Sequence, residues 1–200
     1  MVKIIFATGN QGKVNEIREI LKDVNAEVIT MKEAGVDVDI DENGTTFEEN
    51  AVIKAKTIME ITGCLTLADD SGLEVDYLNK EPGIQSARYM GHDTSYDIKN
   101  QSIIDKLDGV EEAKRTARFV CAIAAAFPDG RVETVRATME GTIAHEIAGG
   151  NGFGYDPIFY LPERGCTSAE ISTEEKNEIS HRGKALRLMR DRLMDMGVFC

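Results

Sequence analysis

Long apolar runs and tryptophan are missing from this sequence, and cysteine and proline are scarce. Its 200 residues contain no tryptophan, four prolines and four cysteines. The apolar stretch near the start, Ile4 to Ala7, is far shorter than the roughly 20 residues that a membrane-spanning helix needs. No later stretch exceeds the length of a core element. We therefore expect a cytoplasmic protein with no membrane partner.

The few cysteines lack the spacing of a metal site or a disulfide framework. They are dispersed through the chain, with no C-x-x-C pair, at Cys64, Cys121, Cys166 and Cys200. Small secreted domains use closely patterned cysteines as cross-links, whereas isolated cysteines in other proteins are usually buried thiols. The sequence therefore predicts buried, reduced cysteines.

Positive charge is also in short supply. The chain has 23 lysines and arginines against 35 acidic residues, a formal net charge of −12, and a pI near 4.8. Such a chain repels polyanions at long range, which excludes a generic nucleic-acid-binding protein but leaves small anionic ligands open. The remaining composition, 42% hydrophobic and 29% charged, is ordinary for a globular protein with one good core.

The spacing of apolar residues predicts an α/β chain. Strands are expected at residues 2–7, 27–31, 64–68, 118–127, 131–139 and 142–147, and helices at 12–22, 94–107 and 180–196. Another helix is expected after Thr46, because Thr46 and Glu49 have the spacing of a capping box. These elements predict a single domain over residues 1–200, with a long mixed β-sheet, flanking helices and two lobes.

The turn between the first strand and helix is a candidate anion site. It reads Ala7-Thr8-Gly9-Asn10-Gln11-Gly12-Lys13. Backbone N–H groups at a helix start attract anions, and Lys13 adds a positive charge. The segment is not a P-loop, because Ala7 replaces a glycine of that motif and Val14 replaces its serine or threonine. Phosphate binding and an ordinary tight turn remain alternatives.

Acidic residues gather in two places that together suggest a cation. Six of them occur without an intervening lysine or arginine: Asp37, Asp39, Asp41, Glu42, Glu48 and Glu49. Such a run is usually a solvated face. Asp69 and Asp70, however, are predicted to end an apolar strand, where adjacent carboxylates repel each other unless a cation or a proton is shared. Oxygen ligands from Asp41 and Asp70 would suit Mg²⁺; a helix N-cap is the alternative for Asp70.

Two later segments have the composition of ligand contacts. The run Gly152-Phe153-Gly154-Tyr155-Asp156 combines small residues, which let a ligand approach the backbone, with an aromatic ring that offers a stacking face. The alternative is an aromatic residue packed on the core. His181 and Arg182 open the last helix, where positive charge opposes the helix dipole. This placement suggests that they face an anion or a carbonyl-rich ligand.

Six blocks of the chain resemble the inosine triphosphate pyrophosphatase family, also called XTP/dITP diphosphatases. The blocks occur in the family's order at residues 6–13, 46–54, 68–73, 82–89, 152–159 and 179–183. They span nearly the whole chain. The resemblance implies a homodimer whose subunit has a long mixed sheet and two lobes around a central cleft. It also implies Mg²⁺-dependent hydrolysis of ITP, dITP and XTP, free nucleotides of the cell's pool, to the monophosphate and pyrophosphate.

The resemblance assigns roles position by position. Asp70 is implied to accept a proton and, with Asp41, to bind the metal. Contacts with the substrate are implied for Thr8, Gly9, Asn10, Gln11, Gly12, Lys13, Lys54, Ser71, Phe153, Gly154, Tyr155, Asp156, Lys176, His181 and Arg182. The family usually has glutamate where this chain has Asp41, so Glu42 is an alternative metal ligand.

Two other functions remain as alternatives at this stage. A related pyrophosphatase of the septum-inhibitor type would act on pyrimidine or modified nucleotides. A noncatalytic nucleotide-sensing module would keep the contacts of Lys13 and Arg182 but would need no paired carboxylates, which Asp69 and Asp70 supply.

Overall fold

A computed structural model describes residues 1–199 of the chain, so Cys200 lies outside the described residues. Its strands are β1 Val2–Phe6, β2 Ala26–Thr30, β3 Leu65–Val75, β4 Thr116–Ala126, β5 Val132–Ile143, β6 Phe159–Leu161 and β7 Cys166–Thr167. They form one sheet in the order β2-β1-β3-β4-β5-β6-β7. β1 pairs in parallel with β2 and β3, whereas β6 pairs antiparallel with β5 and β7. The predicted mixed sheet is confirmed.

Five α-helices and four short 3₁₀ turns accompany the sheet in residues 1–199. The helices are α1 Gln11–Ile20, α2 Phe47–Thr62, α3 Tyr96–Lys106, α4 Thr173–Ile179 and α5 His181–Asp195. The 3₁₀ turns are η1 Asp76–Leu78, η2 Gly83–Gln85, η3 Glu112–Lys114 and η4 Asp156–Ile158. None of the described helices is long and apolar enough to cross a bilayer.

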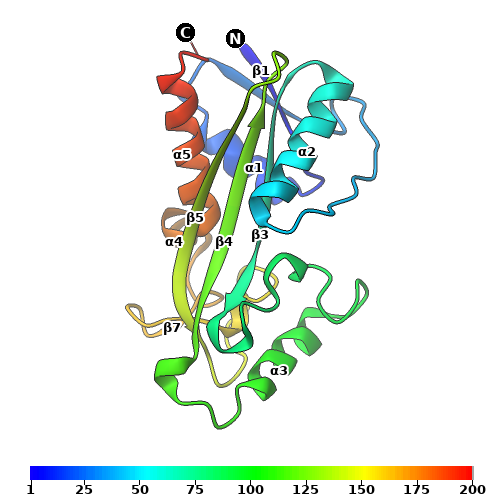
Figure 1. Cartoon of the computed structure of the whole chain (residues 1–200). Coiled ribbons are helices and arrows are strands. Elements are labelled where there is room, and N and C mark those ends of the chain that lie inside the picture. The colour runs from blue at the N-terminus through cyan, green and yellow to red at the C-terminus, as the bar shows by residue number, and fades with distance from the viewer. Residues whose placement is uncertain (200) are drawn as a thin grey trace. The chain divides into compact units, whose positions relative to one another are not determined.

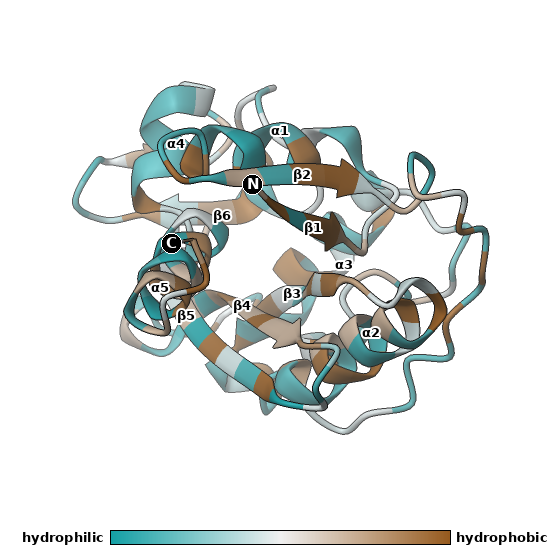
Figure 2. Ribbon diagram, turned by 90° about the horizontal axis from the view of Figure 1, so that it is seen from above, coloured by the Kyte–Doolittle hydropathy of each residue, from teal (hydrophilic) through white to brown (hydrophobic). Residues whose placement is uncertain are grey.

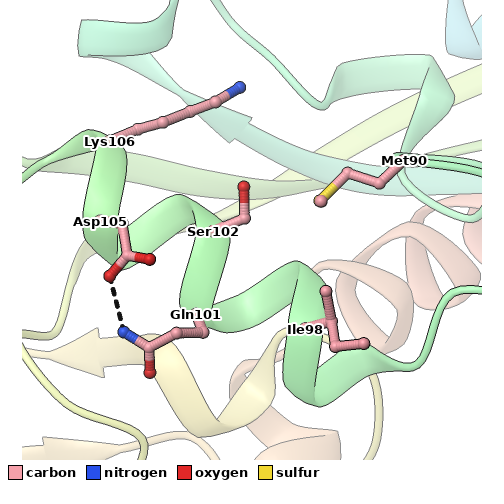
Figure 3. Close-up of a pocket in the computed structure, with 6 residues that line it drawn as sticks. All are labelled: Met90, Ile98, Gln101, Ser102, Asp105 and Lys106. Carbon is pink, nitrogen blue, oxygen red and sulfur yellow. Dashed lines mark hydrogen bonds between the residues drawn. The ribbon is translucent and has the colours of Figure 1, made fainter.

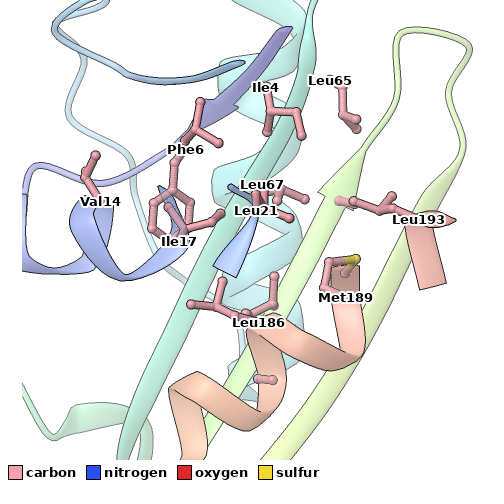
Figure 4. Packing of buried hydrophobic residues seen from close by; sticks show 14 of the residues in the cluster. Ile4, Phe6, Val14, Ile17, Leu21, Leu65, Leu67, Leu186, Met189 and Leu193 are labelled. Carbon is pink, nitrogen blue, oxygen red and sulfur yellow. The ribbon is translucent and has the colours of Figure 1, made fainter. Parts of the chain in front are cut away.

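The chain divides into two compact units, and three strands contain residues of both. Unit 1 comprises residues 1–70, 121–137 and 182–200, and unit 2 comprises residues 71–120 and 138–181. The core of unit 1 joins β1, α1 and α5 through residues such as Phe6, Ile17 and Leu186 (Figure 4). Much of β1 is hydrophobic (Figure 2), in agreement with the complete burial of Ile4.

Unit 2 has a core of its own. Leu73 and Val75 of β3 are buried together with Ile103 of α3, Leu107 at the C-cap of that helix and Phe159 of β6. The apolar face of α3 therefore covers the part of the sheet that belongs to this unit. Because each unit buries its own cluster, each holds its share of the candidate site residues on a packed scaffold.

The strand that carries the paired aspartates is longer than predicted. β3 continues from Leu65 to Val75, so the prediction that the strand stops at Asp69 is wrong. Successive side chains of a strand point to opposite faces, which separates Asp69 from Asp70. Each carboxylate then has its own cationic partner, Lys13 for Asp69 and Lys54 for Asp70, and these cations offset the repulsion from which a shared cation or proton was predicted.

The sequence also divides one long strand into two. Residues 131–139 and 142–147 are predicted as separate strands, but β5 is continuous through Gly141 to Ile143 (Figure 1). A Cβ at Gly141 would lie 2.5 Å from the carbonyl oxygen of Tyr160 in the neighbouring β6. The glycine is needed for this close approach between strands rather than for a turn.

The helix signals are largely confirmed. Thr46 caps α2 by accepting a hydrogen bond from the N–H of Glu49, but the glutamate accepts from Thr45 instead of returning to Thr46. Only half of the predicted capping box therefore forms. A complete box occurs at Ser172 and Glu175, which begin α4, a helix that the sequence analysis did not predict.

Among the described cysteines, Cys64, Cys121 and Cys166 are free thiols. This confirms the prediction of reduced cysteines for these positions. The prediction of burial is confirmed for Cys121 but is wrong for Cys64 and Cys166, which are partly exposed because they lie directly before β3 and at the start of β7.

Candidate functional site

The turn before α1 is organised by one side chain of unit 1. Asn10 caps the helix, since its Oδ1 atom accepts hydrogen bonds from the N–H groups of Gly12 at 2.9 Å and Lys13 at 3.3 Å. The N–H of Asn10 donates in turn to Oγ1 of Thr8 at 3.2 Å. The cap oxygen occupies the place at the helix start where an anion oxygen would bind. Phosphate binding by Thr8 to Lys13 stays a prediction.

Asp69 gathers two cations inside unit 1. Its side chain is only 1% exposed, and its two oxygens lie 3.0 and 2.8 Å from Nζ of Lys13. Nε of Arg182, at the start of α5, donates to Oδ2 of Asp69 over 3.4 Å. Glu16 of α1 lies 3.9 Å from Nη1 of the same arginine. These carboxylates offset the positive charge at the start of α5, which the sequence analysis attributed to an anionic or carbonyl-rich ligand.

The charge of Asp69 is fixed by these neighbours. Burial alone would raise the pKa of its carboxyl group, but Lys13, Arg182 and Lys54 together hold that pKa well below its ordinary value. Conversely, burial would lower the pKa of Arg182, but Asp69 together with Cys121 and Glu16 outweighs this effect and raises that pKa. Asp69 is therefore an anion whose main contacts are cations of the protein itself.

Asp70 has a different set of contacts. Nδ2 of Asn50 donates to its Oδ2 atom at 3.2 Å, and Nζ of Lys54 lies 3.5 Å from its Oδ1 atom. Burial raises the pKa of Asp70 above its ordinary value, against the opposing effects of Lys54 and Asn50. A carboxylate of raised pKa is a stronger proton acceptor than an exposed aspartate. The position in a continuous strand excludes the alternative of a helix N-cap for this residue.

Lys54 connects Asp70 with the acidic loop. Its Nζ atom donates to Oε2 of Glu42 at 2.9 Å, whereas exposed Asp41 accepts from the side chain of Asn43 at 3.4 Å. Among residues 1–199, no three acidic, histidine or cysteine side chains are grouped closely enough to hold a metal ion. The ammonium of Lys54 nevertheless shows that Glu42 and Asp70 accommodate a cation between them. Two carboxylates are the usual protein share of a Mg²⁺ site that is completed by phosphate and water.

The glycine-rich segment of unit 2 folds around a buried carboxylate. Asp156 is 2% exposed and accepts hydrogen bonds from the N–H of Phe153 at 2.8 Å and the hydroxyl of Ser168 at 2.8 Å. Nζ of Lys176 pairs with it at 2.5 Å. A Cβ at Gly152 would lie 2.3 Å from Oδ2 of Asp156, so this turn requires glycine. Asp156 thereby fixes both the loop and the lysine.

The aromatic ring of the same segment faces solvent. Phe153 is 58% exposed, and Nζ of Lys176 lies 5.2 Å from the centre of its ring. The alternative that this residue packs on the core is therefore wrong. Tyr155 is the buried aromatic residue of the segment, and its hydroxyl donates a hydrogen bond to the carbonyl of Ser86 at 2.7 Å. An exposed ring beside a fixed lysine suits a flat, electron-poor ligand.

His181 is buried rather than presented to solvent. It is 7% exposed, and its ring stacks on that of Phe119 with 4.9 Å between the ring centres. Ser71, the first residue of unit 2, is half-buried in β3. The predicted site residues therefore include a group in unit 1 around Asp69 and Asp70 and a group in unit 2 around Asp156 and His181.

Two asparagines that the sequence analysis missed hold these groups in place. Asn50 is 1% exposed, and besides its contact with Asp70 its Oδ1 atom accepts from the N–H of Gly44 at 2.8 Å. Asn100 is also 1% exposed and donates to the carbonyl of Gly154 at 3.0 Å. Both occupy the apolar face of a helix, three residues from Phe47 and Ile103 respectively. A polar residue on the apolar face of a predicted helix is visible in the sequence, and it could have indicated that these two asparagines form buried hydrogen bonds.

A hollow of unit 2 lies away from the predicted site residues. It has a volume of about 540 Å³ and lies along α3, lined by Met90, Ile98, Gln101, Ser102, Asp105 and Lys106 (Figure 3). None of these residues belongs to the predicted site. The hollow is therefore not the candidate active site.

Within an α/β fold, unit 1 therefore holds a capped helix start beside Lys13 and a lysine between two carboxylates, and unit 2 holds an exposed aromatic ring. The chain belongs to the Ham1 family, whose model matches residues 4–192. This confirms the resemblance seen in the sequence blocks.

Individual relatives agree over nearly the full length. A dITP/XTP pyrophosphatase of Desulforamulus reducens is 47% identical over 186 residues, which are 93% of this chain and 92% of that protein. A dITP/XTP pyrophosphatase of Listeria innocua is 47% identical over 98% of this chain and 97% of its own length. The solved structure of a HAM1 protein from Coxiella burnetii has a TM-score of 0.91 at 41% identity and covers 98% of this chain and all of that one.

Proposed function

We propose that this protein hydrolyses non-canonical purine nucleoside triphosphates, namely ITP, dITP and XTP, to the monophosphate and pyrophosphate. One observation carries the proposal: adjacent carboxylates on β3 have separate partners. Asp69 is neutralised by Lys13 and Arg182. Asp70 lies beside Lys54, and the pKa of the Asp70 carboxyl group is raised. The first arrangement positions cations, and the second leaves a carboxylate that can accept a proton. The names of the relatives support the substrate class.

In the proposed reaction, the oxygen of a water molecule attacks the α-phosphorus of the nucleotide. Asp70 accepts the proton of that water. The bond between the α-phosphorus and the oxygen that bridges it to the β-phosphate breaks, and pyrophosphate leaves with the electron pair. Lys13 and Lys54 offset the charge that develops on the leaving group. The turn at Thr8 to Lys13 is proposed to contribute as well, once the side chain of Asn10 releases the N–H groups of Gly12 and Lys13 to the phosphate.

The chemistry of the carboxylates fits a Mg²⁺ ion, which is part of the proposal. Asp70 and one residue of the acidic loop, Asp41 or Glu42, would hold it. The contact of Glu42 with Lys54 supports the glutamate. A bound ion would supply positive charge to phosphate oxygens beyond what the lysines provide.

Recognition of the base is proposed for the residues around the glycine-rich segment and the start of α5. Phe153 offers its exposed ring for stacking, and Asp156 and Lys176 hold the loop that carries it. Hypoxanthine and xanthine have a carbonyl at position 6 of the purine where adenine has an amino group. Donors of Arg182 and His181 satisfy the carbonyl and would face an unmatched donor in adenine, which costs affinity.

We also propose that the protein is a cytoplasmic homodimer, as the family resemblance implies. Its formal charge of −12 supports a free nucleotide rather than a nucleic acid as the substrate.

A panel of nucleoside triphosphates tests the proposed function. The protein is incubated with ITP, XTP, ATP, GTP, dTTP or UTP, with Mg²⁺ or with EDTA, and pyrophosphate and orthophosphate are measured separately. We expect pyrophosphate from ITP and XTP, little from the other nucleotides, and none with EDTA. Turnover of dTTP or UTP would favour a pyrimidine-directed enzyme, and binding without turnover would favour a nucleotide sensor.

A further inference from the structure

Asp69 contacts none of the reacting atoms in the chemistry described above, yet it is one of the most completely buried ionised groups of unit 1. Its side chain is 1% exposed and contacts two side chains of the protein, Lys13 from α1 and Arg182 from α5. A buried carboxylate is costly unless cations and hydrogen bonds compensate it. Its position is therefore explained by the two cations that it holds.

A single oxygen of Asp69 serves both cations. Oδ2 lies 2.8 Å from Nζ of Lys13 and 3.4 Å from Nε of Arg182, while Oδ1 contacts Lys13 alone at 3.0 Å. The ammonium and the guanidinium would repel each other without the carboxylate between them. If one cation moves away from this oxygen, less of the negative charge of the oxygen is neutralised, and the other cation is attracted more strongly.

The two cations have different predicted tasks. Lys13 is 21% exposed at the start of α1, next to the turn proposed for the triphosphate. Arg182 is 9% exposed and is proposed to recognise the base. We infer that Asp69 is a positioning residue that couples triphosphate binding to base recognition by fixing Lys13 and Arg182 against the same carboxylate oxygen. This inference rests on the proposed function.

The neighbouring carboxylate provides a contrast. Asp70 points to the opposite face of β3 and contacts Lys54, a second lysine that is proposed to bind phosphate. Lys54 donates its hydrogen bond to Glu42, and it acts on Asp69 through its charge rather than as a bonded partner. Two lysines therefore share the same proposed task, but only Lys13 is joined through Asp69 to Arg182.

The experiment compares the ratio of kcat/KM for ITP to kcat/KM for ATP among variants. Both nucleotides carry the same triphosphate, so a lost phosphate contact cancels in this ratio. Asp69→Asn, which keeps the shape and removes the charge, is expected to lower the ratio by about tenfold or more, the cost of one hydrogen bond to a charged group. Arg182→Ala is the reference for complete loss of base recognition by this arginine.

Lys13→Ala and Lys54→Ala form the matched pair. Both are expected to reduce kcat/KM for each nucleotide. Lys13→Ala should also lower the ratio, because Asp69 is then free to draw Arg182 towards itself, whereas Lys54→Ala should leave the ratio unchanged. Circular dichroism shows which variants fold. If Asp69→Asn does not fold, the comparison of Lys13→Ala with Lys54→Ala tests the coupling. Lys13 is partly exposed, so its replacement is expected to disturb the fold less than a change at buried Asp69.

The possible outcomes separate this inference from the proposed function. A wild-type protein that releases no pyrophosphate from ITP would remove the proposed function itself. If the wild-type protein does release pyrophosphate, an unchanged ratio in folded Asp69→Asn would overturn the coupling. If Asp69→Asn does not fold, an unchanged ratio in Lys13→Ala would overturn it. A ratio that falls in Lys54→Ala as much as in Lys13→Ala would also overturn it, because Asp69 would then not be the link.

Discussion

Replacing Asp70 with asparagine is expected to lower kcat for ITP hydrolysis by about 10²- to 10⁴-fold, the usual contribution of a positioned proton acceptor. The amide has the same shape and can still accept the hydrogen bond from Asn50, but it cannot take the proton of the attacking water. Burial disfavours the charged form of Asp70, as its raised pKa shows, so the neutral amide of equal shape should cost little stability. Pyrophosphate release under saturating ITP gives kcat, and thermal unfolding followed by circular dichroism reports the fold.

A second aspartate provides the control for this substitution. Asp76 also pairs with two cations, Arg118 at 3.0 Å and Lys80, but it is not among the predicted site residues. Asp76→Asn should therefore retain the wild-type kcat. Activity of Asp70→Asn within about threefold of wild type, far above the range given for a general base, would assign the proton to another group.

Replacing Asp156 with asparagine is expected to have the next largest effect, on KM rather than on kcat. The carboxylate fixes Phe153 and Lys176, and it is 2% exposed. Removing one partner of a buried ion pair typically costs about 3–5 kcal/mol. If about half of that cost appears in substrate binding, KM for ITP rises by roughly 10- to 100-fold. Steady-state kinetics and a lowered melting temperature are the two readouts.

An exposed ion pair of α4, the helix that carries Lys176, is the matched control. Arg164 pairs with Glu175 of α4 at 3.2 Å, with side chains that are 34% and 51% exposed. Exposed pairs contribute little to stability, so Arg164→Gln should change neither KM nor the melting temperature appreciably. An unchanged KM in folded Asp156→Asn would mean that the glycine-rich segment does not recognise the nucleotide.

Elements with strong local signals are predicted well from the sequence. The helix after Thr46 and the strand of residues 2–7 have clear periodicity, and both are found at nearly the expected bounds. The course of β3 could not be predicted in the same way. Two adjacent aspartates favour a turn locally, and cations from three helices, Lys13, Lys54 and Arg182, make an extended strand acceptable there.

The candidate site shows the same division. The turn before α1 and the acidic pair are visible as local patterns, whereas Lys176 has no local signal and came only from the family resemblance. Asp69 was considered as half of an acidic pair, although its partners lie 56 and 113 positions away along the chain. Asn50 and Asn100 are the exceptions among the missed residues, because polar side chains on apolar helix faces can be recognised before a structure is known.

The most direct test of the central claim is the fate of the attacking oxygen. ITP is hydrolysed in water enriched in ¹⁸O, and both products are analysed by mass spectrometry. Because water is proposed to attack the α-phosphorus, the label is expected in IMP and is expected to be absent from pyrophosphate. Label in the pyrophosphate would place the attack at the β-phosphorus, and orthophosphate as the first product would contradict pyrophosphate release altogether.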